Sequence, residues 1–237
     1  MPNALHALAQ IVAGLHDEAG GIAVDGFYDR VIPLTLEDRA VIAAFDFDEM
    51  AYMRELGMTA LVGEAGYTTL ERNWARPTLD LNGMWGGFTG PGAKTVIACE
   101  AHAKLSCRLV PGQVPDEVLA LIEAHIQKHA PKGATVSFTR KPGKALPYAM
   151  PADLPALQAA AEVLEEVLGK KALYVRMGAT LPSAEMFQVL LGAYTLFFSF
   201  STADEQYHAP NEFFRMDRFD AGLRAWALLL NRLGAPN

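Results

Sequence analysis

A segment dense in proline and glycine divides the chain and limits what it can fold into. Residues 141–155 contain four prolines and a glycine. Residues of this kind interrupt helices and strands, and such a density is typical of a linker or hinge. The sequence therefore predicts two units, residues 1–145 and residues 146–237.

The first unit mixes helix and strand patterns. Apolar residues recur at helical spacing in three segments: 2–15, 36–56 and 115–129. Alternation of apolar and polar residues predicts a half-buried strand within 95–109. A second strand is expected over 134–140, and the glycine-rich stretch between residues 57 and 92 is expected to form loops.

The second unit alternates between the two patterns. Helices are predicted in three segments: 154–168, 183–191 and 217–233. Short strands are expected over 173–175 and 194–200, and this alternation is typical of the end of an α/β sheet. In the last helix the stripe expected to face the core consists of Phe219, Leu223, Trp226 and Leu230.

Charge and hydropathy argue against several classes of function. The formal net charge is -7, whereas wrapping nucleic acid needs a basic face against the phosphates. The longest apolar run, residues 189–200, is too short to span a bilayer, and no basic-then-apolar leader precedes the first helix. Cys99 and Cys107, if they share one extended strand, lie roughly 26 Å apart, beyond disulfide reach. We therefore expect a cytoplasmic protein with free thiols that binds neither nucleic acid nor membrane.

Among the histidines, His208 has the position best suited to chemistry. It lies in the polar segment 204–212, just past an apolar run, and loops at strand ends are where α/β enzymes gather catalytic groups. A turn that holds a histidine by chance explains the same residues. His125 and His129 stand four apart on a predicted helix but lack the glutamate of a zinc-protease helix, so a solvated face is the better interpretation.

A second candidate site is the predicted strand-to-helix turn at residues 176–182, R-M-G-A-T-L-P. Backbone amides at such a turn suit an anion, and Arg176 adds bidentate recognition of a carboxylate. Taken alone, the pattern is common at helix starts.

Three ordered motifs resemble those of the aminoacylase and carnosinase superfamily of two-zinc metallopeptidases. Residues 95–112 are similar to the family's lid strand, T-V-I-P followed by K-x-S-x-R-L-V-P. Residues 176–182 resemble its R-x-G-G-S-I-P, and residues 208–212, H-A-P-N-E, resemble its H-S-P-N-E. The glycine-rich region around Trp85 fits the dipeptidase branch of the family.

The resemblance implies both a fold and an activity. It implies a ferredoxin-like α/β sandwich in residues 1–145, a lid that forms the homodimer. Residues 146–237 would hold the last helix–strand units of a zinc-peptidase α/β catalytic domain. The implied reaction is hydrolysis of a small peptide or acyl-amino acid by a metal-activated water.

The resemblance also assigns roles in metal and substrate binding to single residues. His208 would bind zinc, and Glu212 would help to hold its imidazole. Arg108 would grip the terminal carboxylate of the substrate. Thr95 would contact substrate, in the family from the lid of the neighbouring subunit.

The turn at residues 176–182 would complete the carboxylate site. Thr180 stands at the family's serine and would hydrogen-bond the same carboxylate, helped by the backbone amides of Gly178 and Ala179. Ala179 replaces a glycine of the family, which could narrow the approach to bound substrate.

Most of the family's metal site is missing from this sequence. The H-x-D ligand motif, the bridging aspartate, the glutamate pair and the lid histidine of the family would all lie upstream of Met1. One histidine cannot hold two zinc ions, since each needs about four ligands. We therefore expect a truncated chain that contains no catalytic residue and is inactive alone. The alternative is a non-catalytic dimerisation module.

Overall fold

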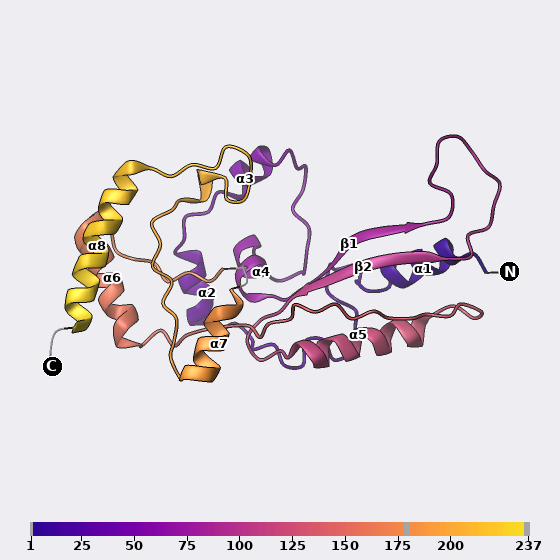
Figure 1. The fold of residues 1–237 in the computed structure, drawn as a ribbon, viewed down its shortest axis with the longest axis horizontal. Coiled ribbons are helices and arrows are strands. Elements are labelled where there is room, and N and C mark those ends of the chain that lie inside the picture. The colour runs from indigo at the N-terminus through magenta and orange to yellow at the C-terminus, as the bar shows by residue number, and fades with distance from the viewer. Residues whose placement is uncertain (1, 178–180, 235–237) are drawn as a thin grey trace. The chain divides into compact units, whose positions relative to one another are not determined.

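Figure 1 shows the computed structural model of the chain, in which residues 2–177 and 181–234 are described. The chain folds as two compact units, one of Met1–Tyr148 with Arg176–Glu185, the other of Ala149–Val175 with Met186–Asn237. The first change of unit thus falls inside the predicted linker. The identification of the two units with a lid and a catalytic part stays a prediction.

The first unit combines helices with a two-stranded sheet, a mixed α/β fold as predicted. In chain order its elements are α1 (Ala4–Ala13), α2 (Leu36–Ala43), α3 (Glu49–Glu55), α4 (Thr69–Ala75), β1 (Thr78–Gly86), β2 (Ala101–Arg108) and α5 (Pro115–His129). The single helix expected over residues 36–56 is two helices, because the Asp48 carboxylate accepts the Ala51 amide at 2.9 Å and starts a new one. The expected loop at residues 57–92 contains α4 and β1.

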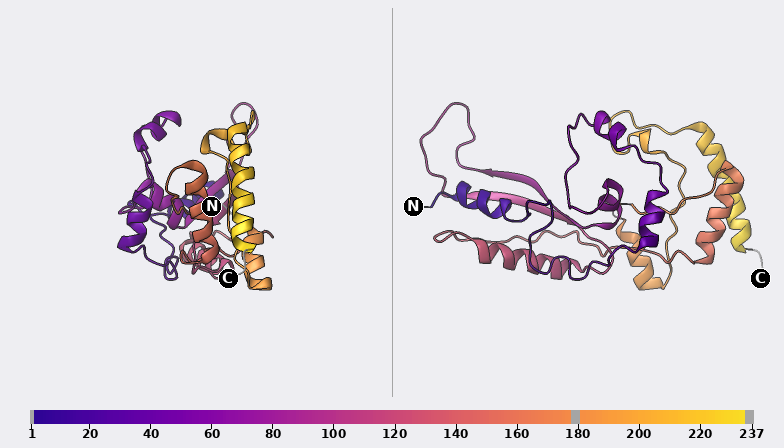
Figure 2. Two further views of the ribbon diagram at one scale, coloured as in Figure 1. Left: turned by 90° about the vertical axis from the view of Figure 1, so that its left-hand side faces the viewer. Right: turned by 180° about the vertical axis from the view of Figure 1, so that it is seen from behind.

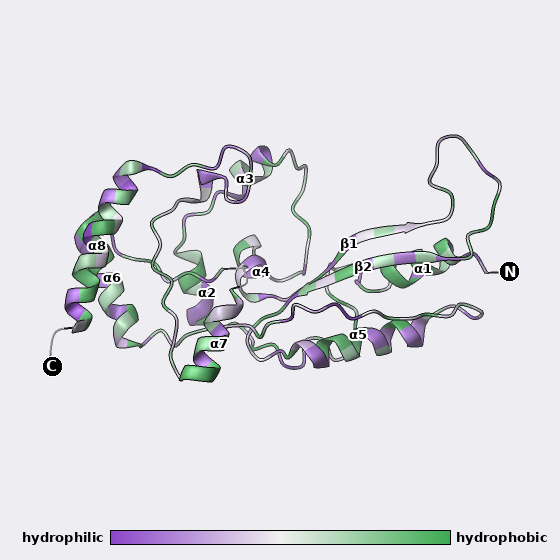
Figure 3. Ribbon diagram, in the orientation of Figure 1, coloured by the Kyte–Doolittle hydropathy of each residue, from purple (hydrophilic) through white to green (hydrophobic). Residues whose placement is uncertain are grey.

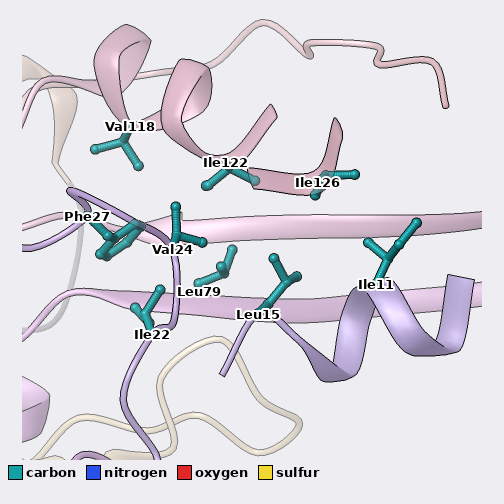
Figure 4. Close-up of a cluster of buried hydrophobic side chains, with 9 residues drawn as sticks. All are labelled: Ile11, Leu15, Ile22, Val24, Phe27, Leu79, Val118, Ile122 and Ile126. Atoms are coloured by element: carbon teal, nitrogen blue, oxygen red, sulfur yellow. The ribbon is translucent and has the colours of Figure 1, made fainter. Parts of the chain in front are cut away.

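The core of the first unit lies between the sheet and helices α1 and α5. Figure 4 shows Val118, Ile122 and Ile126 of α5 in one cluster with Leu79 of β1, and all four are buried. Phe27, from the segment between α1 and α2, is 1% exposed in the same cluster. Burying a side chain of this size stabilises the fold by about 1.5 to 3 kcal/mol. Apolar residues recur at helical spacing on the buried face of α5, and Figure 3 shows hydrophobic and hydrophilic residues alternating along this helix.

The ends of the helices follow from local chemistry. Helix α5 begins with Pro115 in its first turn, followed by two acidic residues, and ends on a lysine and a histidine. This charge order is favourable for the helix dipole. Helix α6 (Pro155–Leu168) ends with the predicted segment 154–168, where Gly169 adopts the left-handed conformation at φ 67°.

The second unit is built around a pair of helices. Figure 2 shows α6 and α8 (Met216–Gly234) side by side from two directions. Between them lie Ala160, Val163, Ala225 and Leu229, and Phe198 joins the cluster. α7 (Pro182–Leu191) contributes residues to both units, and a short 3-10 turn, η1, covers Ala203–Glu205.

The predicted inward stripe of α8 was wrong. Phe219, Leu223, Trp226 and Leu230 are all exposed, whereas Gly222, Ala225 and Leu229 are buried. The small residues allow close packing, since a Cβ at Gly222 would come within 3.1 Å of the Phe200 ring. The buried face of this helix therefore combines two small residues with Leu229, while the predicted stripe lies on the exposed face.

Three predicted strands, 134–140, 173–175 and 194–200, are not strands in the structure. Within residues 2–177 and 181–234, the paired strands are β1 and β2, and an isolated bridge joins His16 to Ile22. A strand exists only through hydrogen bonds to a neighbour. Apolar patterning marks a segment that can pair but does not supply the partner. None of the described helices is both long and apolar enough to cross a membrane.

Candidate functional site

The two lid residues predicted to meet substrate are Arg108, on the outer face of the β1–β2 ladder, and Thr95, which precedes β2. β2 alternates between half-buried and exposed residues, and Arg108 lies at its exposed end, opposite Thr78 of β1. Thr95 is exposed and precedes β2 outside any regular element. The structure therefore leaves both side chains on the surface of the first unit, and their contact with substrate stays a prediction.

A β-bulge gives this face an aromatic residue that the sequence did not predict there. The ladder shifts by one residue between Leu81 and Gly83, so Trp85 pairs with His102 on the polar face. Without the shift, period-two alternation would turn Trp85 to the core side with Leu79. The Trp85 and His102 rings stack at 5.0 Å and 16°.

The turn at residues 176–182 is described only in part. Gly178, Ala179 and Thr180 lie outside the described residues, so their predicted role remains untested. Arg176 is exposed, and its guanidinium donates a hydrogen bond to the Asp38 carboxylate of α2 at 2.6 Å. Hydrogen bonds from Thr35 and, to a smaller extent, the Arg176 charge hold the pKa of Asp38 below its ordinary value.

His208 sits on an unusually strained loop of the second unit. Its imidazole is exposed, and its backbone φ is 59°. Gln206 and Asn211, at φ 55° and 65°, are also left-handed, although none of the three is glycine. Single non-glycine residues with positive φ are uncommon, and a cluster of them is found where the surrounding structure enforces it. Glu212 is exposed, and its predicted support of the imidazole stays a prediction.

The enforcing contacts come from two residues that flank this loop. Glu205 has no exposed surface, and its carboxylate accepts the backbone amides of Thr202 at 3.1 Å and Arg215 at 3.3 Å. The Arg215 guanidinium donates to Asp204 at 2.5 and 3.0 Å and to the Thr202 hydroxyl at 2.7 Å. No sequence pattern marks this arrangement, because a glutamate in a polar run resembles a solvated one and its arginine lies ten residues later.

His125 corrects an expectation. It was predicted on a solvated helix face with His129, but it is buried, with 7% of its surface exposed. Its Nε2 lies 3.2 Å from the Gly14 carbonyl oxygen, and its Nδ1 is buried with no hydrogen-bond partner. The His129 ring is exposed and lies 4.1 Å from the ring of His125. Of the two histidines at i and i+4, the first is therefore buried and the second is exposed.

The described residues supply at most part of a metal centre. In residues 2–177 and 181–234, no three His, Cys, Asp or Glu side chains gather into a group that could hold a metal ion. His208 fits a single ligand position, because its imidazole is exposed on a constrained backbone. A zinc centre at His208 therefore needs ligands from beyond the described part of the chain.

The chain is similar to known proteins in sequence. The family described as "Peptidase dimerisation domain" matches residues 1–134, more than half of the chain. The chain is 28% identical over 210 residues to the Beta-Ala-His dipeptidase of Homo sapiens, covering 86% of this chain and 41% of that protein. It is 25% identical over 231 residues to the Cys-Gly metallodipeptidase DUG1 of Saccharomyces cerevisiae, covering 94% and 47%. The chain thus spans less than half the length of these curated relatives.

Solved structures agree in fold. A metallo-carboxypeptidase of the M20 family from Sulfolobus solfataricus, Sso-CP2, matches with a TM-score of 0.82 and 28% identity, over 97% of this chain and 52% of that one. Human carnosine dipeptidase 1 matches with a TM-score of 0.77 and 26% identity, over 97% and 49%.

Proposed function

Because the chain belongs to the peptidase dimerisation family of the M20 peptidases, within the carnosinase-like dipeptidase superfamily, we propose that it supplies two parts of a zinc-dependent dipeptidase. These parts are the lid and the carboxy-terminal section of the catalytic domain. The substrate is a small peptide or acyl-amino acid with a free carboxylate. Similar proteins are named as dipeptidases for Beta-Ala-His and Cys-Gly, which supports this substrate class.

The observation that carries the proposal is the His208 loop. An exposed imidazole on a backbone held in an unfavourable conformation is suited to binding a ligand at a fixed position. When bound, zinc would supply a water activated for attack on an amide. The chain's own contribution would be one ligand, His208, and an arginine, Arg108, suited to a carboxylate.

The remaining metal ligands would come from residues other than those described. The chain matches its curated relatives over less than half of their length, which leaves room for a segment with the H-x-D motif and the glutamate pair. We expect the chain alone to bind zinc weakly and to hydrolyse no dipeptide. Stoichiometric tight zinc with hydrolysis by the chain alone would contradict this.

Complementation tests the assignment of His208. We would co-express the chain with the amino-terminal half of a related dipeptidase and assay hydrolysis of β-alanyl-histidine and cysteinyl-glycine with added zinc. Activity is expected with the wild-type chain and lost with His208→Ala. The matched control is His102→Ala, which removes an exposed histidine of the lid strand. Hydrolysis by both the His208→Ala and the His102→Ala variants at the wild-type level would refute the ligand role of His208.

Homodimerisation through the lid is the second part of the proposal. The family match to a dimerisation domain covers residues 1–134. Among the described residues β1 and β2 pair only with each other, so each has one edge without a strand partner, to which another chain can pair. We expect a dimer by light scattering at micromolar concentration, and a monomer would contradict it.

A non-catalytic dimerisation module is the alternative, favoured by the lack of a metal-binding group among the described residues. Dimers that never gain activity in the complementation assay would support it. A cytoplasmic location stays a prediction, supported by the two free thiols, Cys99 and Cys107.

A further inference from the structure

The loop that carries His208 is closed at its base by one buried carboxylate. Glu205 Oε2 accepts the Thr202 amide at 3.1 Å, and Oε1 accepts the Arg215 amide at 3.3 Å. The backbone of Glu205 takes part too, since its carbonyl accepts the amide of Phe213 at 3.3 Å. One residue therefore ties the start of the segment to its end, and the loop of residues 206–212 projects between these ties.

Arg215 contacts the base of the loop with its partly exposed guanidinium. Its guanidinium lies against Glu205 Oε1 at 3.5 Å, forms a fork with Asp204, and packs 4.9 Å from the Phe213 ring centroid. A carboxylate without solvent contact needs such a partner, because an unpaired buried charge is costly. The pair therefore stays together while the loop keeps its shape.

The loop itself holds little that would keep it in this shape. Two turn hydrogen bonds, from Ala209 to Gln206 and from Glu212 to Ala209, lie inside it. Three non-glycine residues of the loop, Gln206, His208 and Asn211, have a left-handed backbone conformation. An unconstrained loop avoids this conformation at such residues. The contacts of Glu205 and Arg215 at the base must therefore hold the loop in this conformation.

We infer that Glu205 and Arg215 are positioning residues, which act through the backbone to fix the direction of the His208 imidazole. The physical claim concerns the geometry of the loop, and its use in catalysis rests on the proposed function. Neither residue touches substrate in this account. Removing either should release the loop while leaving the helix pair α6–α8 folded.

Hydrogen exchange of the chain alone tests the claim. In Glu205→Gln the amides of Phe213 and Arg215 should exchange about tenfold faster or more, as expected for loss of a buried charged acceptor. Peptides from α6 and α8 should keep their wild-type rates. Arg215→Gln leaves the buried Glu205 carboxylate without its charged partner. It should accelerate the same amides, and it decides the question if Glu205→Gln does not fold.

Arg232 provides a matched control. It is 34% exposed, compared with 36% for Arg215, and it likewise bridges two carboxylates, Glu162 and Glu166, in the second unit. Arg232→Gln should leave exchange at residues 202–215 unchanged. Equal acceleration of these residues by both arginine variants, or uniform acceleration along α6 and α8, would show general destabilisation and overturn the inference.

The imidazole itself supplies a second readout. In protein with ¹³C-labelled histidine, the ring signal of His208 should move towards the value of an unstructured peptide in Glu205→Gln, while the ring of His102, stacked on Trp85, keeps its shift. An unchanged His208 signal together with unchanged exchange would refute the positioning role. Both readouts need no metal, so failed complementation counts against the proposed function alone.

Discussion

Each unit contains an arginine that forms a fork with a carboxylate and packs on an aromatic ring, here called an arginine clamp. The two clamps differ in how exposed the arginine is. In the first unit Arg76 forms a fork with Glu64 at 2.6 and 2.7 Å, and its guanidinium lies between the rings of Tyr28 and Tyr67. Its side chain is only 9% exposed. In the second unit Arg215 forms a fork with an exposed aspartate, lies on one ring and is 36% exposed.

The span of the contacts, together with the burial of the arginine itself, separates a clamp that closes a whole unit from one that closes a single loop. The Arg76 clamp joins residues on both sides of α2 and α3, so the long excursion of the first unit closes on it. The Arg215 clamp joins residues no more than thirteen apart. Loss of the first should therefore weaken a whole unit, whereas loss of the second should free one loop.

The largest effect is expected from Arg76→Met. The substitution leaves the Glu64 carboxylate, 20% exposed, without its partner and removes two cation–ring contacts. Breaking a buried pair from one side costs about 3 to 5 kcal/mol of unfolding free energy. Arg76→Lys keeps the charge but loses the fork, so its cost should be intermediate.

Urea denaturation can isolate this effect in the first unit. In a Trp226→Phe background the fluorescence comes from Trp74 and Trp85, which both belong to that unit. The control is Arg54→Met, since Arg54 is 68% exposed and 3.9 Å from Asp48, and such pairs contribute about 0 to 1 kcal/mol. Similar losses from Arg76→Met and Arg54→Met would show that the buried Arg76 contacts stabilise the first unit no more than an exposed ion pair does.

The elements predicted well are those whose pattern is local. Helix α5 follows from Pro115 and the stripe Val118, Ile122 and Ile126, which lie within a few turns of one another. The helix stop at Gly169 is equally local. β1 was not predicted, because its bulge breaks the alternation of apolar and polar residues. Its partner strand, β2, begins fifteen residues after β1 ends, so the pairing is not visible within the segment itself.

The site shows the same division between local and distant causes. His208 and Arg108 could be proposed from motifs, because each motif is contiguous in the sequence. Glu205 and His125 could not, since the burial of each depends on residues elsewhere: Arg215 for the glutamate, and the Gly14 carbonyl, 111 positions away, for the histidine. A polar residue shows its own chemistry in the sequence but not its partner.

An intermediate effect is expected from the thiol of Cys107. Burial, with a smaller contribution from Asp80, raises its pKa from 9.0 to about 11. The folded state therefore favours the neutral thiol, so this stabilisation is complete below pH 9 and is lost as pH rises through 11. Two pKa units correspond to about 2 to 3 kcal/mol.

Other groups titrate in the same range, so the measurement is a difference. The unfolding free energy of the wild type should fall more steeply between pH 9 and 11 than that of Cys107→Ala, by about 2 to 3 kcal/mol. Parallel curves would show that the thiol is solvated. Alkylation at pH 8 offers an independent check, because exposed Cys99 should react well before Cys107.

The smallest effect is expected at the exposed end of the second clamp. Hydrogen bonds from Arg215 and then Thr202 lower the pKa of Asp204 from 3.8 to about 2. Its contribution to the loop is present above pH 3.8 and is lost as pH falls through 2, the reverse of the thiol.

In a carboxyl NMR titration Asp204 should stay ionised at pH 3 in the wild type, whereas Arg215→Gln should return its midpoint towards 3.8. Salt near 1 M should reduce the difference, because exposed charges are screened. A midpoint that ignores both the substitution and the salt would mean that the Arg215–Asp204 fork does not persist in solution, leaving buried Glu205 as the part of the clamp that closes the loop.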